Sequence, residues 1–346
     1  MNVIAEGGHG VDGLDDIPGK VAGMAGGKPY PANARNLAHH PRAQLVSVFD
    51  IAAKAAADTA AELGVTAAAT VEEVLADPRV QAVLIATSTD THVPLITAAA
   101  RAGKAVLCEK PIDLSLARAE ACGAEIAPLN ATVMIGFNRR FDPSFRNVRD
   151  RIAAGEIGAL EQVVITSRDP APPPVAYIKV SGGLFRDMTI HDFDMARYLA
   201  GDIESVFAAG GNLVDPEIKE AGDIDAAMIV LRAKSGALIH INNSRRCAYG
   251  YDQRVEAFGV GGMLQAHNRF ATSVQSWGKH GTGTRDTAQP FFIERYAEAY
   301  AAEVDHFVES VLTGKPPMSS FADGVAALKL AEAAGESMRT GKAVSL

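Results

Sequence analysis

Short apolar runs alternate with alanine-rich stretches through residues 43–128, and this alternation constrains the fold more than any other feature. Three runs have the length and composition of buried strands: Ala43–Phe49, Gln81–Thr87 and Lys104–Cys108. A helical pattern follows each run, and Gly64 and Gly103 close two of these helices. Strands that alternate with helices at this spacing predict an α/β domain over residues 1–128, built on a doubly wound parallel sheet.

The pattern changes after residue 130, where strand-like segments follow one another across short turns such as Lys234–Gly236. We assign them to Val163–Arg168, Val206–Leu213, Ala226–Ala233, Ala237–Asn243, Gln253–Phe258 and Gly262–His267. Apolar residues at helical spacing predict a long helix from Ile293 to Val311 and a last one over Asp323–Met338. Residues 129–346 therefore form a second, α+β domain with a large open, mostly antiparallel sheet. We assign it substrate binding and oligomerisation, and consider that its last helix packs back on the first domain.

Composition excludes several classes of partner. A net charge of −8 leaves no basic excess to neutralise a nucleic acid. No apolar run approaches the roughly 20 residues that span a bilayer, and the first residues lack the pattern of a secretion signal. The three cysteines are widely spaced, which fits a reducing cytoplasm and matches no metal-ligand pattern. We therefore expect a cytoplasmic protein with no membrane contact and no metal.

Asp50 ends a strand that is otherwise apolar. In a Rossmann-like sheet, a carboxylate there accepts hydrogen bonds from the ribose hydroxyls of a dinucleotide and repels a 2′-phosphate. This position favours NAD over NADP. The alternative is that Asp50 caps the helix that begins near Ile51.

Two further strands end in polar residues. Thr87-Ser88-Thr89-Asp90-Thr91-His92 follows one strand, and Cys108-Glu109-Lys110-Pro111 ends the next. Ligands of such sheets bind at the carboxyl ends of the strands, so both segments are candidates for cofactor contact. A lysine there can also stabilise a reacting oxygen. The alternative for Asp90 or Thr91 is a helix cap.

Asp187 and His191 are four positions apart in the segment from Gly182 to Asp194. On a single helix they would lie on one face. An aspartate beside an imidazole fixes its tautomer and raises its basicity, so the pair could take the proton of an alcohol. A metal site is less favoured because no third ligand is evident, and a surface ion pair is the simpler alternative.

Taken together, these motifs resemble one family in order and spacing. They are the run Thr87–His92, the triplet Glu109-Lys110-Pro111, the segment Gly136–Asp142 and the pair Asp187 and His191. Their order is similar to the glucose-fructose oxidoreductase, inositol dehydrogenase and rhizopine catabolism family. Ser167–Pro174, Ser181–Arg197 and Tyr249–Asp252 resemble its inositol 2-dehydrogenases, and the resemblance covers residues 33–346.

The resemblance implies an activity and assigns roles. It implies oxidation of a cyclic polyol, foremost myo-inositol to 2-keto-myo-inositol, with NAD as the hydride acceptor. Lys110, Asp187 and His191 are the implied catalytic set. The implied cofactor residues are Asp50, Thr87, Ser88, Thr89, His92, Glu109 and Lys110. The implied substrate residues are Arg139, Asp169, Asp187, His191 and Tyr251, with Tyr249 as the alternative to Tyr251. A homotetramer or homodimer is the implied assembly, since an open sheet leaves one face to bury.

Residues 1–32 depart from the family pattern of a strand, a G-x-G-x-x-G turn and a helix. Counting back from Asp50 reaches Ala25-Gly26-Gly27-Lys28-Pro29-Tyr30, which lacks the fingerprint, and Pro31 follows it. Gly8-His9-Gly10-Val11-Asp12-Gly13 has the glycine pattern but lies too early, and we interpret it as chance. We therefore expect that the first strand is lost, that NAD binds weakly and that stability is low.

Two alternatives to an inositol 2-dehydrogenase stay open. One is a dehydrogenase of another inositol isomer or of a sugar. The other is a relative impaired in cofactor binding that serves as a binding or structural subunit. Titration with NADH separates this second alternative from an active enzyme.

Overall fold

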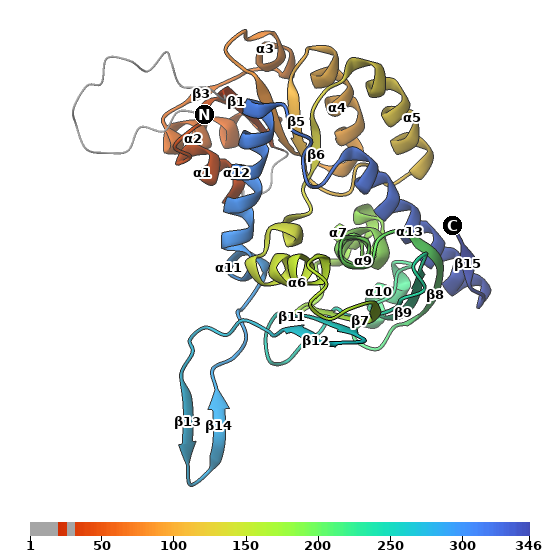
Figure 1. Cartoon of the computed structure of the whole chain (residues 1–346). Coiled ribbons are helices and arrows are strands. Elements are labelled where there is room, and N and C mark those ends of the chain that lie inside the picture. The colour runs from red at the N-terminus through yellow and green to blue at the C-terminus, as the bar shows by residue number, and fades with distance from the viewer. Residues whose placement is uncertain (1–19, 26–31) are drawn as a thin grey trace. The chain divides into compact units, whose positions relative to one another are not determined.

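The structure is a computed structural model that describes residues 20–25 and 32–346. The chain divides into two compact units, each with one large sheet (Figure 1). Of the described residues, the first unit combines those up to Asn138 with Glu298–Val325, and the second combines Arg139–Ala297 with Ala326–Leu346.

Six parallel strands form the sheet of the first unit, in the order β3-β2-β1-β4-β5-β6. They are β1 (Lys20–Ala25), β2 (Gln44–Asp50), β3 (Thr66–Ala67), β4 (Ala82–Ala86), β5 (Ala105–Cys108) and β6 (Val133–Ile135). This is the strand order of dinucleotide-binding folds, in which ligands bind where the order reverses, here between β1 and β4. The predicted Rossmann-like domain is confirmed.

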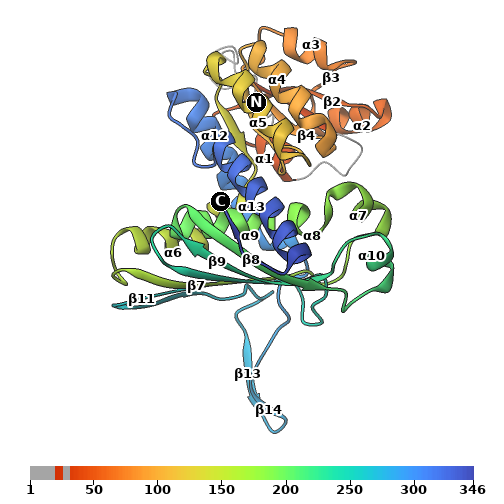
Figure 2. The ribbon, with the colours of Figure 1, turned by 90° about the vertical axis from the view of Figure 1, so that its right-hand side faces the viewer.

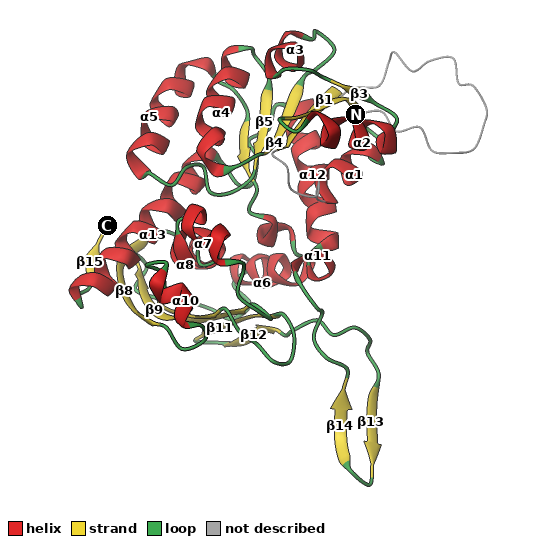
Figure 3. Cartoon of the chain, turned by 180° about the vertical axis from the view of Figure 1, so that it is seen from behind, coloured by secondary structure: helices red, strands yellow, loops and turns green. Residues whose placement is uncertain are grey.

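Helices cover both faces of this sheet. They are α1 (Ala32–Ala38), α2 (Ala53–Leu63), α3 (Val71–Ala76), α4 (His92–Arg101), α5 (Leu116–Ile126) and most of α12 (Ala297–Thr313). Figure 3 shows α4 and α5 side by side on one face, with α1 and α2 on the other. The buried runs of β4 and β5 therefore have apolar neighbours on both sides, which explains why they lack a polar alternation.

The expectation that the chain lacks its first strand is wrong. Residues Lys20–Ala25 form β1, which lies between β2 and β4 and pairs with both. Backbone groups make this ladder, so it needs no glycine fingerprint, and the absence of the fingerprint did not imply the absence of the strand. α1 begins at Ala32. The early glycine pattern Gly8–Gly13, Pro29 and Pro31 lie outside the described residues.

The second unit has a seven-stranded sheet in the order β12-β11-β7-β10-β9-β8-β15. The strands are β7 (Leu160–Arg168), β8 (Ile203–Gly211), β9 (Ala226–Ala233), β10 (Leu238–Ser244), β11 (Asp252–Gly259), β12 (Gly262–Ala266) and β15 (Val344–Ser345). β7 and β10 run parallel, and all other neighbours run antiparallel. The predicted open, mostly antiparallel sheet is confirmed, although the sequence pattern did not reveal β15.

Helices of the second unit gather over one face of its sheet, as Figure 2 shows for α6, α8, α9 and α13. The unit contains α6 (Pro143–Ala153), α7 (Val175–Ser181), α8 (Gly183–Asp187), α9 (Ile190–Ala200), α10 (Pro216–Glu220), α11 (Phe292–Arg295) and, from residue 326, α13 (Phe321–Thr340). A two-stranded hairpin of β13 (Gln275–Gly278) and β14 (Gly281–Arg285) extends from the opposite side. The predicted long helix over Ile293–Val311 is wrong in one respect, because it breaks at Tyr296 between α11 and α12.

Candidate functional site

The strands of the first unit end level with one another. Ala25, the last residue of β1, is in register with Asp50 of β2 and with Ala86 of β4. Cys108 of β5 is in register with Ile85 and with Ile135 of β6. The segments that begin at Ile51, Thr87 and Glu109 therefore leave the sheet at the same edge. This edge holds the carboxyl ends of the strands, where this fold binds its ligands.

Asp50 is buried at this edge, with 6% of its surface exposed. Its Oδ1 accepts a hydrogen bond from the Ala52 N–H over 2.8 Å. Helix α2 begins at Ala53 with Ala52 as its N-cap, so Asp50 shapes the turn before the helix without being the cap residue. A buried carboxylate beside the end of β1 fits the two hydroxyls of a nucleotide ribose.

The hydroxyl-rich segment after β4 forms a short 3₁₀ turn over Thr89–Thr91 and then α4. The Thr91 hydroxyl lies 2.6 Å from the Thr87 hydroxyl and 2.7 Å from the Ser88 carbonyl oxygen. Ser88 is exposed, and Thr87 and Thr89 are half-buried. The Thr91 hydroxyl therefore stabilises the turn through its contacts with Thr87 and Ser88. The Ser88 side chain is exposed and available to a ligand.

His92 is buried beneath that turn. Its Nδ1 lies 2.8 Å from the Pro111 carbonyl oxygen and its Nε2 3.2 Å from the Thr87 carbonyl oxygen. Burial lowers the pKa of His92, and the two backbone oxygens act in the opposite direction. The imidazole thus joins the segment after β4 to the segment after β5, which makes it a positioning residue for both.

Glu109 and Lys110 follow β5 and are half-buried. The Glu109 N–H donates to the Ile85 carbonyl oxygen over 2.9 Å, so the segment stays attached to the sheet beyond its last strand residue. The peptide bond between Lys110 and Pro111 is cis. A Cβ added to Gly136 would lie 3.1 Å from Glu109 Oε2, so glycine at the end of β6 lets the two chain segments approach closely.

In the second unit, a row of polar side chains crosses three neighbouring strands on the buried face of the sheet. Ser167 of β7 is in register with Asn243 of β10 and with Gln253 of β11, and all three are at most 3% exposed. Apolar side chains precede or follow them at every second position, such as Ile165 and Ile241. The buried face therefore changes from apolar to polar at one end of the sheet.

Asp192 of α9 lies on this row and is fully buried. Its Oδ1 accepts from the Ser167 hydroxyl over 2.5 Å and from Arg139 Nη1 over 2.5 Å. Its Oδ2 accepts from Asn243 Nδ2 over 2.8 Å. Arg139 thus has protein partners for one guanidinium nitrogen, and Asp192 balances its charge in the interior.

Asp187 and His191 do not share a helix, contrary to the sequence-based expectation. Asp187 is the last residue of α8, and His191 is the second residue of α9. Between them the Thr189 N–H donates to Leu184 O, five residues back, which interrupts the helical register. The Tyr177 hydroxyl donates to Asp187 Oδ1 over 2.9 Å, and Arg245 Nη2 lies 3.7 Å from Asp187 Oδ2.

Asp169 follows β7 directly and is half-buried. Its backbone N–H donates to the Ser244 carbonyl oxygen over 2.9 Å. Burial raises the pKa of Asp169 to about 7, and the charge of Asp187 acts in the same direction while Arg139 opposes it. A carboxyl group of this kind exchanges its proton near neutral pH, beside the polar row.

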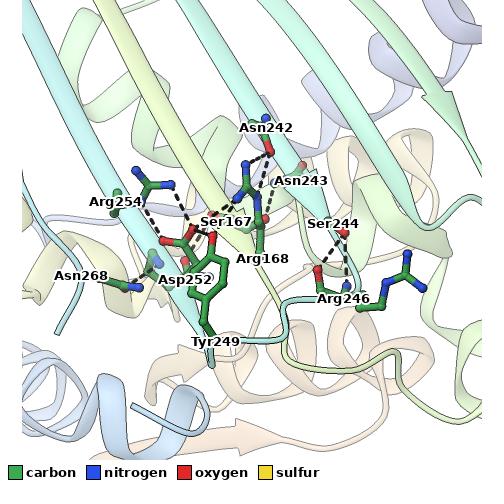
Figure 4. Close-up of polar contacts among 11 residues, drawn as sticks. Ser167, Arg168, Asn242, Asn243, Ser244, Arg246, Tyr249, Asp252, Arg254 and Asn268 are labelled. Carbon is green, nitrogen blue, oxygen red and sulfur yellow. Dashed lines mark hydrogen bonds and ion pairs between the residues drawn. The ribbon is translucent and has the colours of Figure 1, made fainter. Parts of the chain in front are cut away.

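Tyr249 and Tyr251 lie in different surroundings. The Tyr249 hydroxyl donates to Asp252 Oδ2 over 2.7 Å and accepts from Arg168 Nη1 over 2.7 Å (Figure 4). Arg168 and Asp252 alternate with Ser167 and Gln253 along their strands, so they point to the opposite face of the sheet.

Tyr251 is buried and packs edge-to-face on Tyr296, with ring centroids 6.1 Å apart. The Tyr296 hydroxyl donates to Gln253 Oε1 over 3.2 Å, which connects this pair to the polar row. Gly250 separates the two tyrosines with φ of +106°, and a Cβ there would lie 2.9 Å from the Ala288 carbonyl oxygen. This arrangement favours Tyr251 as the residue near the polar row.

Sequence reasoning missed several members of this cluster. They are Asp192, Asn243, Gln253, Tyr296, Tyr177 and Arg245. The sequence pattern could have identified Asn243 and Gln253. Each is a polar residue at a position where the alternation along its strand predicts a buried side chain. Only the pairing of the strands brings these positions together.

Within residues 20–25 and 32–346, no three His, Cys, Asp or Glu side chains are grouped so as to hold a metal ion. In the same part of the chain, no helix has the length and hydropathy needed to cross a bilayer.

A doubly wound parallel sheet joined to an open sheet with a buried polar end defines the class of two-domain, nucleotide-dependent oxidoreductases. The profile described as "Oxidoreductase family, NAD-binding Rossmann fold" matches residues 21–137, and the "GFO/IDH/MocA C-terminal domain" matches residues 145–265. The chain is 45% identical to an inositol 2-dehydrogenase of Rhizobium meliloti over 93% of its own length and 98% of that protein. The chain belongs to the GFO/IDH/MocA family of oxidoreductases, as its motifs predict.

Solved structures agree with this assignment. A myo-inositol dehydrogenase from Corynebacterium glutamicum superposes with a TM-score of 0.92 at 45% identity, covering 95% of this chain and 98% of that one. A scyllo-inositol dehydrogenase from Lactobacillus casei, with bound NAD(H) and scyllo-inositol, has a TM-score of 0.86 at 28% identity, over 94% and 98% of the two chains. The prediction of NAD as the cofactor is confirmed by the family profile.

Proposed function

We propose that this protein oxidises myo-inositol to 2-keto-myo-inositol with NAD. The observation that carries the proposal is the buried polar row of Ser167, Asn243 and Gln253 with Asp192. A substrate with a hydroxyl on every ring carbon needs fixed donors and acceptors on several sides, and a site built to bind hydroxyls rejects analogues that lack them. The likeness to inositol dehydrogenases supports the same substrate class.

Lys110, Asp187 and His191 are the proposed catalytic set. His191 takes the proton from the hydroxyl at the reacting carbon, and Asp187 orients its imidazole. In this proposal Lys110 stabilises the oxygen as the ketone forms, which is a role that a lysine ammonium group can fill. When bound, NAD supplies the hydride acceptor.

Asp50 holds the adenosine ribose in this proposal, since its carboxylate is buried at the switch point beside the end of β1. Thr87, Ser88, Thr89 and Glu109 bind the cofactor from the ends of β4 and β5, and His92 holds those two segments together. On the substrate side, Arg139, Asp169 and Tyr251 bind the remaining hydroxyl groups. Arg139 and Tyr251 do so from buried positions next to the polar row.

A second candidate is oxidation of scyllo-inositol, because the chain is also similar to an enzyme that binds that isomer. The two isomers differ at one carbon. The relevant experiment measures NADH formation with myo-inositol, scyllo-inositol and glucose, each at equal concentration. A kcat/KM for myo-inositol at least about tenfold above the others supports the proposal. A preference for scyllo-inositol or glucose would replace it, and no turnover with any of them favours the binding-subunit alternative.

We also propose that the protein is a homotetramer or homodimer that buries the open face of its seven-stranded sheet. Figure 2 shows helices α6, α8, α9 and α13 over the other face. Large apolar side chains are exposed on the open face: Phe207, Met228, Val230, Phe258 and Met263. Val230 is in register with Phe207 on β8, and Phe258 with Met263 on β12, so they form continuous apolar patches.

The assembly can be tested by light scattering of the full chain. Val230→Glu places a charge in the centre of the patch and is expected to shift the mass toward the monomer. Leu213→Glu is the matched control, because Leu213 is 75% exposed and lies outside the sheet strands. A monomeric wild type, or a Val230→Glu variant that keeps the wild-type mass, rules out this interface.

A cytoplasmic location is proposed on the chemistry of the cysteines. Cys108, Cys122 and Cys247 are all free and buried. Burial raises the pKa values of the Cys108 and Cys122 thiols, which keeps them protonated. A chain without disulfides and with inert thiols is typical of a reducing compartment.

A further inference from the structure

Arg245 follows β10 directly and has a buried side chain, with 1% exposed. Its Nη2 lies 3.4 Å from Asp223 Oδ2 and 3.7 Å from Asp187 Oδ2. One guanidinium group therefore stands between two carboxylates that come from different parts of the chain. A buried cation with two anionic partners has a fixed place, because moving it away from either would leave a charge uncompensated in the interior.

Asp223 also anchors the opposite end of α8. Its Oδ1 accepts from the Leu184 N–H over 3.0 Å, at the first turn of that helix. Gly183 has φ of +81°, and a Cβ there would lie 2.7 Å from Asp223 Oδ1. Glycine at 183 therefore lets the backbone approach the Asp223 carboxylate, which satisfies a helix donor that would otherwise have no partner.

Helix α8 is five residues long, from Gly183 to Asp187. Asp223 holds its first turn, and Arg245 reaches the carboxylate of its last residue while pairing with Asp223. The Tyr177 hydroxyl donates to the other oxygen of Asp187. These contacts fix both the place of the helix and the direction of the Asp187 carboxylate.

We propose that Arg245 and Asp223 are positioning residues for Asp187, holding α8 at both ends so that the Asp187 carboxylate keeps the orientation that His191 requires. The inference rests on the proposed function, in which Asp187 orients the general base. Glycine at 183 follows from this arrangement, because a side chain there would collide with the Asp223 carboxylate.

The test compares Arg245→Met, Arg245→Lys and wild type in the full chain, with Arg197→Met as the control. Arg197 lies on α9 and pairs with Asp202 over 3.2 Å, so its loss tests the removal of an arginine and its ion pair from the same helix that carries His191. Arg245→Met is expected to lower kcat about tenfold or more, because small misplacements of a catalytic group are costly. The KM for myo-inositol should change much less. Arg245→Lys should recover part of the loss, and Arg197→Met should leave kcat within about twofold.

The pH profile separates positioning from general destabilisation. The Arg245 charge lowers the pKa of the neighbouring Asp169, and its loss favours protonation of the groups around it, so the acidic limb of kcat for Arg245→Met should move to higher pH. Loss of folded structure alone would lower kcat at every pH without moving that limb, and this outcome would overturn the inference. Wild-type kcat and profile in Arg245→Met would overturn it as well.

Two further measurements keep the inference testable if a variant or the enzyme assay fails. If Arg245→Met does not fold, Asp223→Asn removes one partner of Arg245 and keeps an oxygen for the Leu184 N–H. It should then lower kcat by less than Arg245→Met does and move the acidic limb to lower pH, because it removes a negative charge and leaves Arg245 in place. If the wild type oxidises no cyclitol, the proposed function fails. The melting temperatures of Asp187→Asn, Arg245→Met and the double variant still test the contact, and additive shifts would refute it.

Discussion

The Asp192 carboxylate accepts the Ser167 hydroxyl over 2.5 Å and lies equally close to Arg139 Nη1, so one buried oxygen joins a sheet strand to a buried cation. Its second oxygen is held by Asn243. Asp192 is thus the centre of the polar row, although it contributes no group to the proposed chemistry.

Asp192→Asn should destabilise the protein by about 3–5 kcal/mol, because it leaves the Arg139 guanidinium buried without its carboxylate. Urea unfolding followed by circular dichroism measures this change. Asp150→Asn is the control, since Asp150 pairs with arginines at the surface and should change stability by less than about 0.5 kcal/mol. A loss below about 1 kcal/mol for Asp192→Asn would mean that Arg139 finds another partner.

Because of Asp169, the free energy of unfolding should decrease as pH rises. Its pKa is about 7 in the folded chain, against about 3.9 in an unfolded one, so the folded state binds the extra proton between these values. The free energy of unfolding contributed by this group is therefore greatest below about pH 4 and declines up to about pH 7. The measurement is the difference in melting temperature between wild type and Asp169→Asn from pH 5 to 8. A difference that does not vary with pH would contradict the raised pKa.

His191→Ala should lower kcat by about a hundredfold or more, as loss of a general base typically does. Lys110→Ala should lower kcat similarly and weaken NAD binding as well, since Lys110 follows β5 at the carboxyl edge of the parallel sheet. Steady-state kinetics and NADH titration distinguish the two effects. Near-normal turnover of His191→Ala would remove it from the mechanism, and an unchanged Lys110→Ala variant would make that lysine structural.

The cofactor preference should depend on Asp50. Wild type should prefer NAD clearly over NADP, because the buried carboxylate repels a 2′-phosphate. Asp50→Ser combined with Ile51→Arg should narrow the preference, and the single Ile51→Arg variant is the control, as Ile51 is 85% exposed. The ratio of kcat/KM for the two cofactors is the measurement. Equal use of both by wild type would contradict the ribose role of Asp50.

Local patterns predicted the fold well where burial follows a regular period. The strands from β7 to β12 and the parallel strands β2, β4 and β5 follow alternating or continuous apolar residues, which the sequence displays directly. β15 is two residues long and depends on its pairing with Val206, so no local pattern could reveal it. The break at Tyr296 was hidden for a related reason, because the apolar spacing continues through it.

The candidate site was predictable only in part, since its members meet through strand register. Asp187 and His191 stood out as a motif, but the interruption at Thr189 places them on separate helices. Arg245 and Asp223 are 22 positions apart and are joined by the sheet and the loop before it. A charged residue at the end of an apolar strand can bind a ligand, cap a helix or form a buried ion pair. Which of these it does depends on a partner residue that is distant in the sequence.

The segment Ala25–Pro31 should limit NAD binding in this chain. Ala25 and Tyr30 stand where the fingerprint has its first and third glycines, and Pro31 removes a backbone donor from the start of the helix. A loop with those donors binds the pyrophosphate through charge-assisted hydrogen bonds, each contributing roughly 1.5–3 kcal/mol. Replacing residues 25–30 by a G-x-G-x-x-G turn, together with Pro31→Ala, should therefore raise NAD affinity by about tenfold or more.

Because β1 is present between β2 and β4, the same replacement should leave the melting temperature of the NAD-free protein nearly unchanged. NADH fluorescence titration and thermal melts with and without NAD measure both effects. The matched control is Gly8→Ala with Gly13→Ala, which disrupts the early glycine pattern and should leave NAD affinity as it is. If that control abolishes NAD binding while the replaced loop gains nothing, the early glycines bind the phosphates and the register of β1 does not define the phosphate loop.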